Sequence, residues 1–336
     1  MSAAVENLMD IEEEVDRRIQ AVNSFFMNSD HIKKILEMIH ALRLRGFRGD
    51  GSAMCMQISG PTGAGKTMLF QRYLARTDAQ RTDDHVPVLC FKMPTRYTEP
   101  VFLGTILEAY GARSFNDRQN PHQLAKRVRD LITAKRTELI MIEDLQHVID
   151  QKERTAKIPY YAADEIKAFL LDDVKVPVVF NGLTIADQLF IRNRQLRMRR
   201  RYNPELKPFD WKDALSREQF TIMVRLFARR AEFQNYAELE DSLVERIWRA
   251  TGGVPGELAT LFKAAAELGV RRGVARLTQE LLAIAHAENA DVDVGWKNVF
   301  TLAVLPRNSS EDEPDQSRVT KLTKGIARVG KEKGAR

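Results

Sequence analysis

Residues 60–67 read Gly60-Pro61-Thr62-Gly63-Ala64-Gly65-Lys66-Thr67. This string satisfies G-x-x-x-x-G-K-[ST], the pattern of a loop that binds nucleotide phosphates. Its glycines let the backbone turn tightly, so that successive N–H groups point at a polyphosphate. Lys66 is expected to reach the β- and γ-phosphates, and the Thr67 hydroxyl is expected to ligate Mg²⁺. The sequence therefore predicts that all eight residues bind ATP.

The residues on either side of this loop support the interpretation. Residues 54–59 form an apolar run that predicts a buried strand, and residues 68–74 carry apolar side chains at helical spacing. A helix that starts at the loop adds its positive N-terminal end to the phosphate site. The alternative is a glycine-rich turn with a chance lysine, and the strand–loop–helix order argues against it.

A second apolar run ends in two carboxylates. Residues 139–142 are Leu-Ile-Met-Ile, and Glu143 and Asp144 follow. A neighbouring strand of a parallel sheet would place them beside Thr67, where Glu143 would hold Mg²⁺ and Asp144 would polarise the attacking water. The usual order is Asp then Glu, and the shorter Asp144 predicts slow hydrolysis. The alternative is an acidic pair at a strand end, which is common on any α/β surface.

A further polar residue, Asn181, ends the next apolar run, residues 176–180. At that position it could contact the γ-phosphate or the attacking water. The alternative is a turn asparagine, because Asn-Gly is itself a strong turn signal. We favour the functional interpretation.

The order of the elements predicts an α/β fold. Continuous apolar strands alternate with helices, which indicates a parallel sheet covered on both faces and hence a three-layer αβα core. Strand signals stop at residue 214, and four helical stretches follow. The expected organisation is an N-terminal helical arm (1–29), an α/β core (30–212), a helical lid (213–290) and a C-terminal extension, largely a disordered tail (291–336).

Composition narrows the class of protein. The chain has 336 residues, a formal net charge of +6 and two cysteines, each inside a strand-like apolar run. The mild positive charge permits an anionic partner without requiring one. No apolar run approaches the roughly 18 residues that span a bilayer, and no secretory signal is apparent. We expect a cytoplasmic protein that makes no membrane contact.

Positive charge concentrates in residues 192–201, of which six are arginine. Two functions compete with a simple solvated basic face. One is an arginine donated to the nucleotide of a neighbouring subunit, where it stabilises transition-state charge. The other is contact with the phosphate backbone of nucleic acid. The position of the segment after the Asn181 strand favours the first function for at least one arginine.

Taken in order, these motifs resemble an AAA+ ATPase. The order is the phosphate-binding loop, the Glu143–Asp144 strand, Asn181, the arginines, and a helical lid with Gly-Gly-Val-Pro-Gly at 252–256. Within that class the chain is similar to the TniB/TnsC family of transposition regulators. Residues 87–94, 106–111, 176–182 and 193–196 carry this narrower likeness, which covers about residues 25–290.

The resemblance implies an ATP-dependent protein that assembles on double-stranded DNA as rings or helical filaments. Such proteins link a target-selection factor to a transposase, and in CRISPR-associated transposons the selector is guided by RNA. Lys66 and Thr67 match the phosphate-loop roles, Glu143 and Asp144 match the second motif, and Asn181 matches the sensor position. The trans-acting finger would be one of three residues: Arg199, Arg200 or Arg201. No arginine follows Pro255 in the lid motif, which is a departure from many AAA+ proteins.

DNA contacts are predicted in the loops between the second strand and the Glu143 strand. The candidates, which could neutralise phosphates without reading sequence, are Lys92, Arg96, Arg113, Arg118 and Lys126. Scattered solvated charges are the alternative for each of them. Two other functions remain open: a replication initiator or helicase loader of the same superfamily, and a signalling ATPase that binds no nucleic acid. The lack of a recognisable DNA-reading domain after the lid argues against the first.

Overall fold

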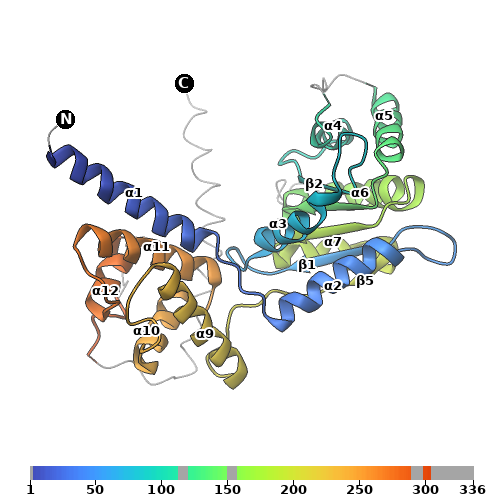
Figure 1. Cartoon of the computed structure of the whole chain (residues 1–336). Helices are drawn as coiled ribbons and strands as arrows, with labels where there is room; N and C mark the ends of the chain where they lie inside the picture. The colour runs from blue at the N-terminus through green and yellow to red at the C-terminus, as the bar shows by residue number, and fades with distance from the viewer. Residues whose placement is uncertain (1–2, 113–119, 150–156, 289–297, 304–336) are drawn as a thin grey trace, which may run out of the picture. The chain divides into compact units, whose positions relative to one another are not determined.

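The computed structural model describes residues 3–112, 120–149, 157–288 and 298–303. The chain divides into two compact units (Figure 1). The α/β unit comprises residues 28–61 and 65–206, and the helical unit comprises residues 1–27, 62–64 and those from 207 onward. Each unit is described by itself below.

The α/β unit is built on a five-stranded sheet with the strand order β2-β3-β4-β1-β5. All four pairings between neighbouring strands are parallel. The strands are β1 (Cys55–Ser59), β2 (Val88–Lys92), β3 (Leu139–Glu143), β4 (Val178–Gly182) and β5 (Arg200–Tyr202). Every residue of β1, β3 and β4 is buried, as expected for a parallel sheet with both faces covered. The predicted α/β fold class is confirmed.

Helices and short helical turns connect these strands. They are α2 (Asp30–Arg45), α3 (Lys66–Thr77), η1 (Asp78–Gln80), α4 (Glu99–Ala109), α5 (Pro121–Ala134), η2 (Leu145–Val148), α6 (Lys157–Ile166), the π-helix η3 (Lys167–Asp173), η4 (Thr184–Ala186), α7 (Asp187–Arg192) and α8 (Arg194–Arg199). Local chemistry sets their starts. The Ser29 hydroxyl accepts from the backbone of Ile32 at the start of α2, and Asn120 caps α5 just ahead of Pro121.

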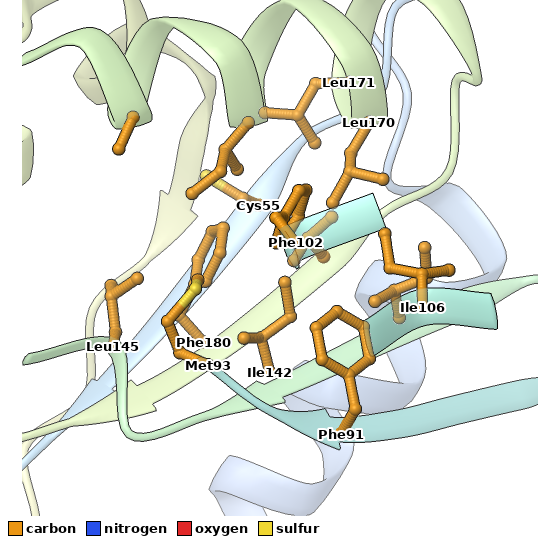
Figure 2. Close-up of a cluster of buried hydrophobic side chains, with 14 of the residues drawn as sticks. Cys55, Phe91, Met93, Phe102, Ile106, Ile142, Leu145, Leu170, Leu171 and Phe180 are labelled. Atoms are coloured by element: carbon orange, nitrogen blue, oxygen red, sulfur yellow. The ribbon is translucent and has the colours of Figure 1, made fainter. Parts of the chain in front are cut away.

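A large apolar cluster covers one face of the sheet (Figure 2). Phe91, Ile142 and Phe180 come from adjacent strands and lie in register across the sheet. Leu170 and Leu171 of η3 belong to the same buried cluster. This close packing holds the strands in place, so the residues at their carboxyl ends have well-defined positions.

The helical unit contains α1 (Ala3–Asn23), α9 (Ala214–Arg230), α10 (Asp241–Thr251), α11 (Pro255–Arg271) and α12 (Gln279–Glu288). Helix α1 packs along α11, with Val22 in the apolar cluster of this unit. An ion pair of 2.7 Å between Arg271 and Glu12 adds to that contact. The predicted tail beyond residue 303 lies outside the described residues. No helix in the described ranges is long and apolar enough to cross a membrane.

The arginine-rich segment holds more regular structure than the sequence indicated. It begins at the last residue of α7, continues through α8 and ends in β5, an edge strand that pairs with β1. A three-residue strand rich in arginine carries no apolar pattern, so only its pairing with β1 identifies it.

Candidate nucleotide-binding site

The phosphate-binding loop leaves the carboxyl end of β1 and leads directly into α3. At Gly60 a Cβ atom would lie 2.5 Å from the backbone oxygen of Leu206, so a side chain has no room there. Gly65 precedes the first residue of α3 and has a φ of 94°, a left-handed conformation that favours glycine. The backbone therefore requires glycine at two of the predicted positions, Gly60 and Gly65. The first residues of α3 direct their N–H groups to the loop.

Lys66 lies across this loop. Its Nζ donates to the backbone oxygens of Gly60 and Pro61, each at 2.8 Å. Burial of the side chain lowers the pKa of Lys66 to about 8, and the nearby Asp144 opposes that shift. An anion with strong acceptor oxygens would stabilise the protonated form of Lys66, which burial disfavours, so the site fits a polyphosphate.

Thr67 and Glu143 meet as the sequence predicts, but β3 is not the neighbour of β1 that the sequence led us to expect, because β4 lies between them. The Thr67 hydroxyl donates to Oε2 of Glu143 at 2.7 Å, and the Glu143 side chain is buried at the end of β3. A hydroxyl and a carboxylate are ligands that suit Mg²⁺, which usually takes its remaining ligands from phosphates and water. No group of three or more His, Cys, Asp or Glu residues in the described chain could hold a metal alone. The metal site stays a prediction that requires the nucleotide.

Asp144 and Asn181 also come together. The backbone N–H of Asp144 donates to Oδ1 of Asn181 at 3.1 Å, and Asp144 itself has a left-handed backbone with a φ of 59°. The Asn181 side chain is buried, and its Nδ2 has no partner among the described residues. A buried amide donor without an acceptor is costly. A phosphate or water oxygen bound here would satisfy it.

The sequence missed two neighbours of these residues. Gln146 donates from Nε2 to Oδ1 of Asp144 at 3.0 Å and accepts from the backbone of Leu183 at 3.1 Å, so it fixes the Asp144 side chain between two loops. Cys90 lies with Sγ 4.0 Å from Oε1 of Glu143, and burial raises its pKa to about 12, which keeps the thiol neutral. Neither residue belongs to a spacing pattern, and only the adjacency of β2, β3 and β4 reveals them.

The three finger candidates make their contacts elsewhere in the α/β unit. Arg199 binds Ser52 and Asp172, and Arg200 donates to Gln57 at 3.0 Å. Arg201 is exposed and donates to the backbone oxygen of Arg45 at 2.7 Å. These contacts involve none of Lys66, Glu143 and Asn181, so the structure does not bring the arginines to their own phosphate-binding loop.

The predicted DNA contacts are spread over the α/β unit. Lys92 ends β2, with its side chain 70% exposed and its Nζ 3.9 Å from Oδ2 of Asp144. Arg96 is exposed between β2 and α4, and Lys126 is exposed on α5. Arg113 and Arg118 lie outside the described residues. All five stay predictions.

A parallel sheet in the order β2-β3-β4-β1-β5, a phosphate-binding loop after β1, and the carboxylates of Glu143 and Asp144 at the carboxyl end of β3 define an AAA+ ATPase. The chain belongs to the TniB family, because the family model described as bacterial TniB protein matches residues 18–212. It is therefore an AAA+ ATPase of DNA transposition. No curated protein matches it by sequence.

Solved structures share the fold at low identity. The Cdc6p protein of Pyrobaculum aerophilum aligns with a TM-score of 0.58 and 12% identity over 79% of this chain and 69% of that one. The ADP form of the Aeropyrum pernix ORC2 protein aligns with a TM-score of 0.56 and 16% identity over 80% of this chain and 72% of that one. Drosophila ORC bound to DNA aligns with a TM-score of 0.54 and 18% identity over 82% of this chain and 65% of that one. At these identities the likeness shows the fold alone.

Proposed function

We propose that this chain binds ATP with Mg²⁺, hydrolyses it slowly, and assembles through the bound nucleotide into rings or filaments on double-stranded DNA. In that state it would link a target-selection protein to a transposase. The observation that carries the nucleotide role is the convergence of Lys66, Thr67, Glu143 and Asn181 at the carboxyl ends of β1, β3 and β4. Membership of the TniB family favours transposition over the role of a replication initiator.

Each residue of the site has a separate role in this proposal. The backbone of the loop and Lys66 would hold the phosphates, while Thr67 and Glu143 would hold Mg²⁺. The metal, when bound, neutralises the charge that develops between the β- and γ-phosphates. Asp144, held by Gln146, would accept a proton from the attacking water, and the free Nδ2 of Asn181 would orient that water or the γ-phosphate. The shorter reach of an aspartate supports slow turnover.

Assembly on DNA has independent support. Drosophila ORC, which shares the fold, is solved bound to DNA. This chain carries a net charge of +6, and Lys92, Arg96 and Lys126 are exposed on its α/β unit. Phosphate contacts by such residues hold DNA without regard to its sequence, which suits a protein that takes its target site from a partner.

The test is to image and sediment the full chain with duplex DNA in the presence of ATP, ADP or a slowly hydrolysed ATP analogue. ATP and the analogue should produce regular assemblies on DNA, and ADP should not. Lys66→Ala should abolish assembly, whereas Asp144→Asn should preserve it and slow turnover. Normal assembly by Lys66→Ala in ATP would refute the proposed role of the nucleotide.

A further inference from the structure

The arginine-rich segment 192–201 divides into two groups by exposure. Arg192, Arg194, Arg197 and Arg201 are exposed. By contrast, the side chains of Arg199 and Arg200 are only 12% and 18% exposed. A guanidinium group that is largely removed from water needs a partner, so the roles of Arg199 and Arg200 follow from what they contact.

Arg199 ties the end of α8 to two other parts of the α/β unit. Its Nη2 donates to Oδ1 of Asp172 in η3 at 2.6 Å, and its Nη1 contacts the hydroxyl of Ser52 in the loop before β1. Lys167 also pairs with Asp172 at 2.8 Å. Arg199 is therefore committed within its own subunit and is not available to a partner.

Arg200 is committed in the same way, to the strand that leads into the phosphate-binding loop. Its Nη1 donates to Oε1 of Gln57 at 3.0 Å and lies 3.3 Å from Oδ1 of Asp187. Its guanidinium also stands over the ring of Phe190, 4.7 Å from the centroid. Gln57 is fully buried in β1, so the loss of Arg200 would leave it without this partner.

The other end of α8 is fastened as well. The Asn193 side chain accepts from the backbone N–H of Leu196 at 2.9 Å and donates to Asp164 at 2.7 Å. Lys167 donates to Gln195 at 2.9 Å. A six-residue helix has little stability alone. These contacts at both ends therefore give α8 a fixed orientation.

The fixed orientation leaves one face of α8 exposed. Arg194, Arg197 and Met198 follow the i, i+3, i+4 spacing of a single helix face, whereas Leu196 is buried and Arg199 is partly buried. Met198 is 56% exposed, and Ile191 at the end of α7 is 64% exposed. No ion pair joins Arg194 or Arg197 to another described residue. Exposed methionine and arginine together are characteristic of protein–protein interfaces.

We propose that Arg194 and Arg197 contact the phosphates of a nucleotide held by a neighbouring copy of this chain. Arg199 and Arg200 are positioning residues, which hold α8 in the orientation that this contact needs. The inference rests on the proposed function and assigns the trans-acting role to residues other than the three that the sequence favoured. The exposed Met198 on this face and the exposed Ile191 at the end of α7 favour a protein partner over DNA, because a DNA backbone offers no apolar surface to cover them.

The test uses mixed assemblies of the full chain. As an unassembled subunit without DNA, the double variant Arg194→Ala/Arg197→Ala should bind ATP with wild-type affinity and unfold at the wild-type temperature, because its own phosphate-binding loop is intact. It should lose DNA-stimulated hydrolysis by on the order of 10³-fold, the scale of a trans-acting arginine. Adding Asp144→Asn, which assembles and keeps both arginines but turns ATP over slowly, should restore part of the hydrolysis, because about a quarter of randomly mixed head-to-tail interfaces pair an intact Asp144 with intact arginines.

The positioning residues require a different readout. Arg199→Ala should lower the unfolding temperature and kcat while leaving the affinity of the subunit for ATP unchanged. Asp172→Asn should reproduce that kcat loss, although a carboxylate cannot bind phosphate. The double variant Arg199→Ala/Asp172→Asn should lose no more kcat than either single variant, since both substitutions remove the same contact. Arg199→Lys, which can still pair with Asp172, should recover most of the activity.

Three results would overturn the inference: wild-type hydrolysis by Arg194→Ala/Arg197→Ala, a loss that Asp144→Asn fails to restore, or an unchanged kcat in Asp172→Asn. A DNA contact predicts the second result, because the loss would then appear as weaker DNA binding by the variant subunit itself. Failure of wild-type protein to assemble with ATP would instead contradict the proposed function.

Discussion

At the scale of single residues, the site depends on how burial tunes a few polar groups. Burial of Lys66 under the loop lowers its pKa to about 8. Asn181 keeps a buried amide donor without a partner among the described residues. A bound oxyanion would stabilise both groups, so part of the proposed affinity for nucleotide would come from groups that are poorly satisfied without it.

Lys66 makes nucleotide affinity depend on pH. Below pH 8 its amine is protonated before ATP binds, and above pH 8 binding must first supply a proton. The affinity for ATP should therefore be flat from about pH 6.5 to 7.5 and fall above pH 8, approaching tenfold per pH unit. Isothermal titration at several pH values measures this dependence. Lys66→Arg is the matched control, because arginine stays charged and should remove the decline above pH 8.

The same shift acts on stability with a defined sign. Because the folded pKa of Lys66 lies below the unfolded value of 10.5, the unfolded chain binds more protons between about pH 8 and 10.5. The contribution of Lys66 to the free energy of unfolding should thus rise with pH across that window. Urea unfolding of the wild type and of Lys66→Met, compared at pH 7.5 and 9.5, isolates this contribution. An equal difference between the two proteins at both pH values would contradict the shift.

At the scale of elements, the turn from β1 into α3 tolerates little change. A Cβ atom at Gly60 would meet the backbone oxygen of Leu206, which cannot move aside as a flexible side chain could. Gly49 is the matched control, since nothing lies within 4 Å of a Cβ atom there. Comparing alanine substitutions at Gly60 and Gly49 separates the effect of this close backbone contact from the general cost of replacing a glycine.

Gly60→Ala should therefore lower the free energy of unfolding by about 1–3 kcal/mol, the usual cost of overpacking. It should also weaken ATP binding, because relief of the clash displaces the loop. Gly49→Ala should change neither quantity by more than about 0.5 kcal/mol. Denaturant unfolding and nucleotide titration of both variants measure the two effects, and equal behaviour of the pair would contradict the packing argument.

At the scale of the whole molecule, the proposed assembly on DNA has an electrostatic consequence. Binding through phosphate contacts releases counterions, so the logarithm of affinity should fall linearly with the logarithm of salt concentration. Replacing Lys126 with alanine should weaken ATP-dependent DNA binding for all sequences alike and reduce the salt slope by about 1. Lys175→Ala removes an exposed charge outside the predicted DNA set and serves as the control. A slope unchanged by Lys126→Ala removes that residue from the predicted contacts.

The local pattern of the chain determined the α/β class and the candidate nucleotide-binding residues. Gly60 to Thr67 and the strand ending in Glu143 are short, continuous strings whose chemistry depends on neighbours in sequence, so they can be read without a structure. The meeting of Thr67 and Glu143 followed from them, because a parallel sheet gathers the carboxyl ends of its strands at one edge.

Only the tertiary structure decided how the arginines divide and what surrounds Asp144. Arg199 and Arg200 look like their exposed neighbours in sequence, and pairing with Asp172 and Gln57, residues distant along the chain, buries them. The partnership of Gln146 with Asp144 likewise depends on strand order. Sequence patterns record local periodicity, whereas the partner of a charged side chain is set by long-range packing, which no local pattern encodes.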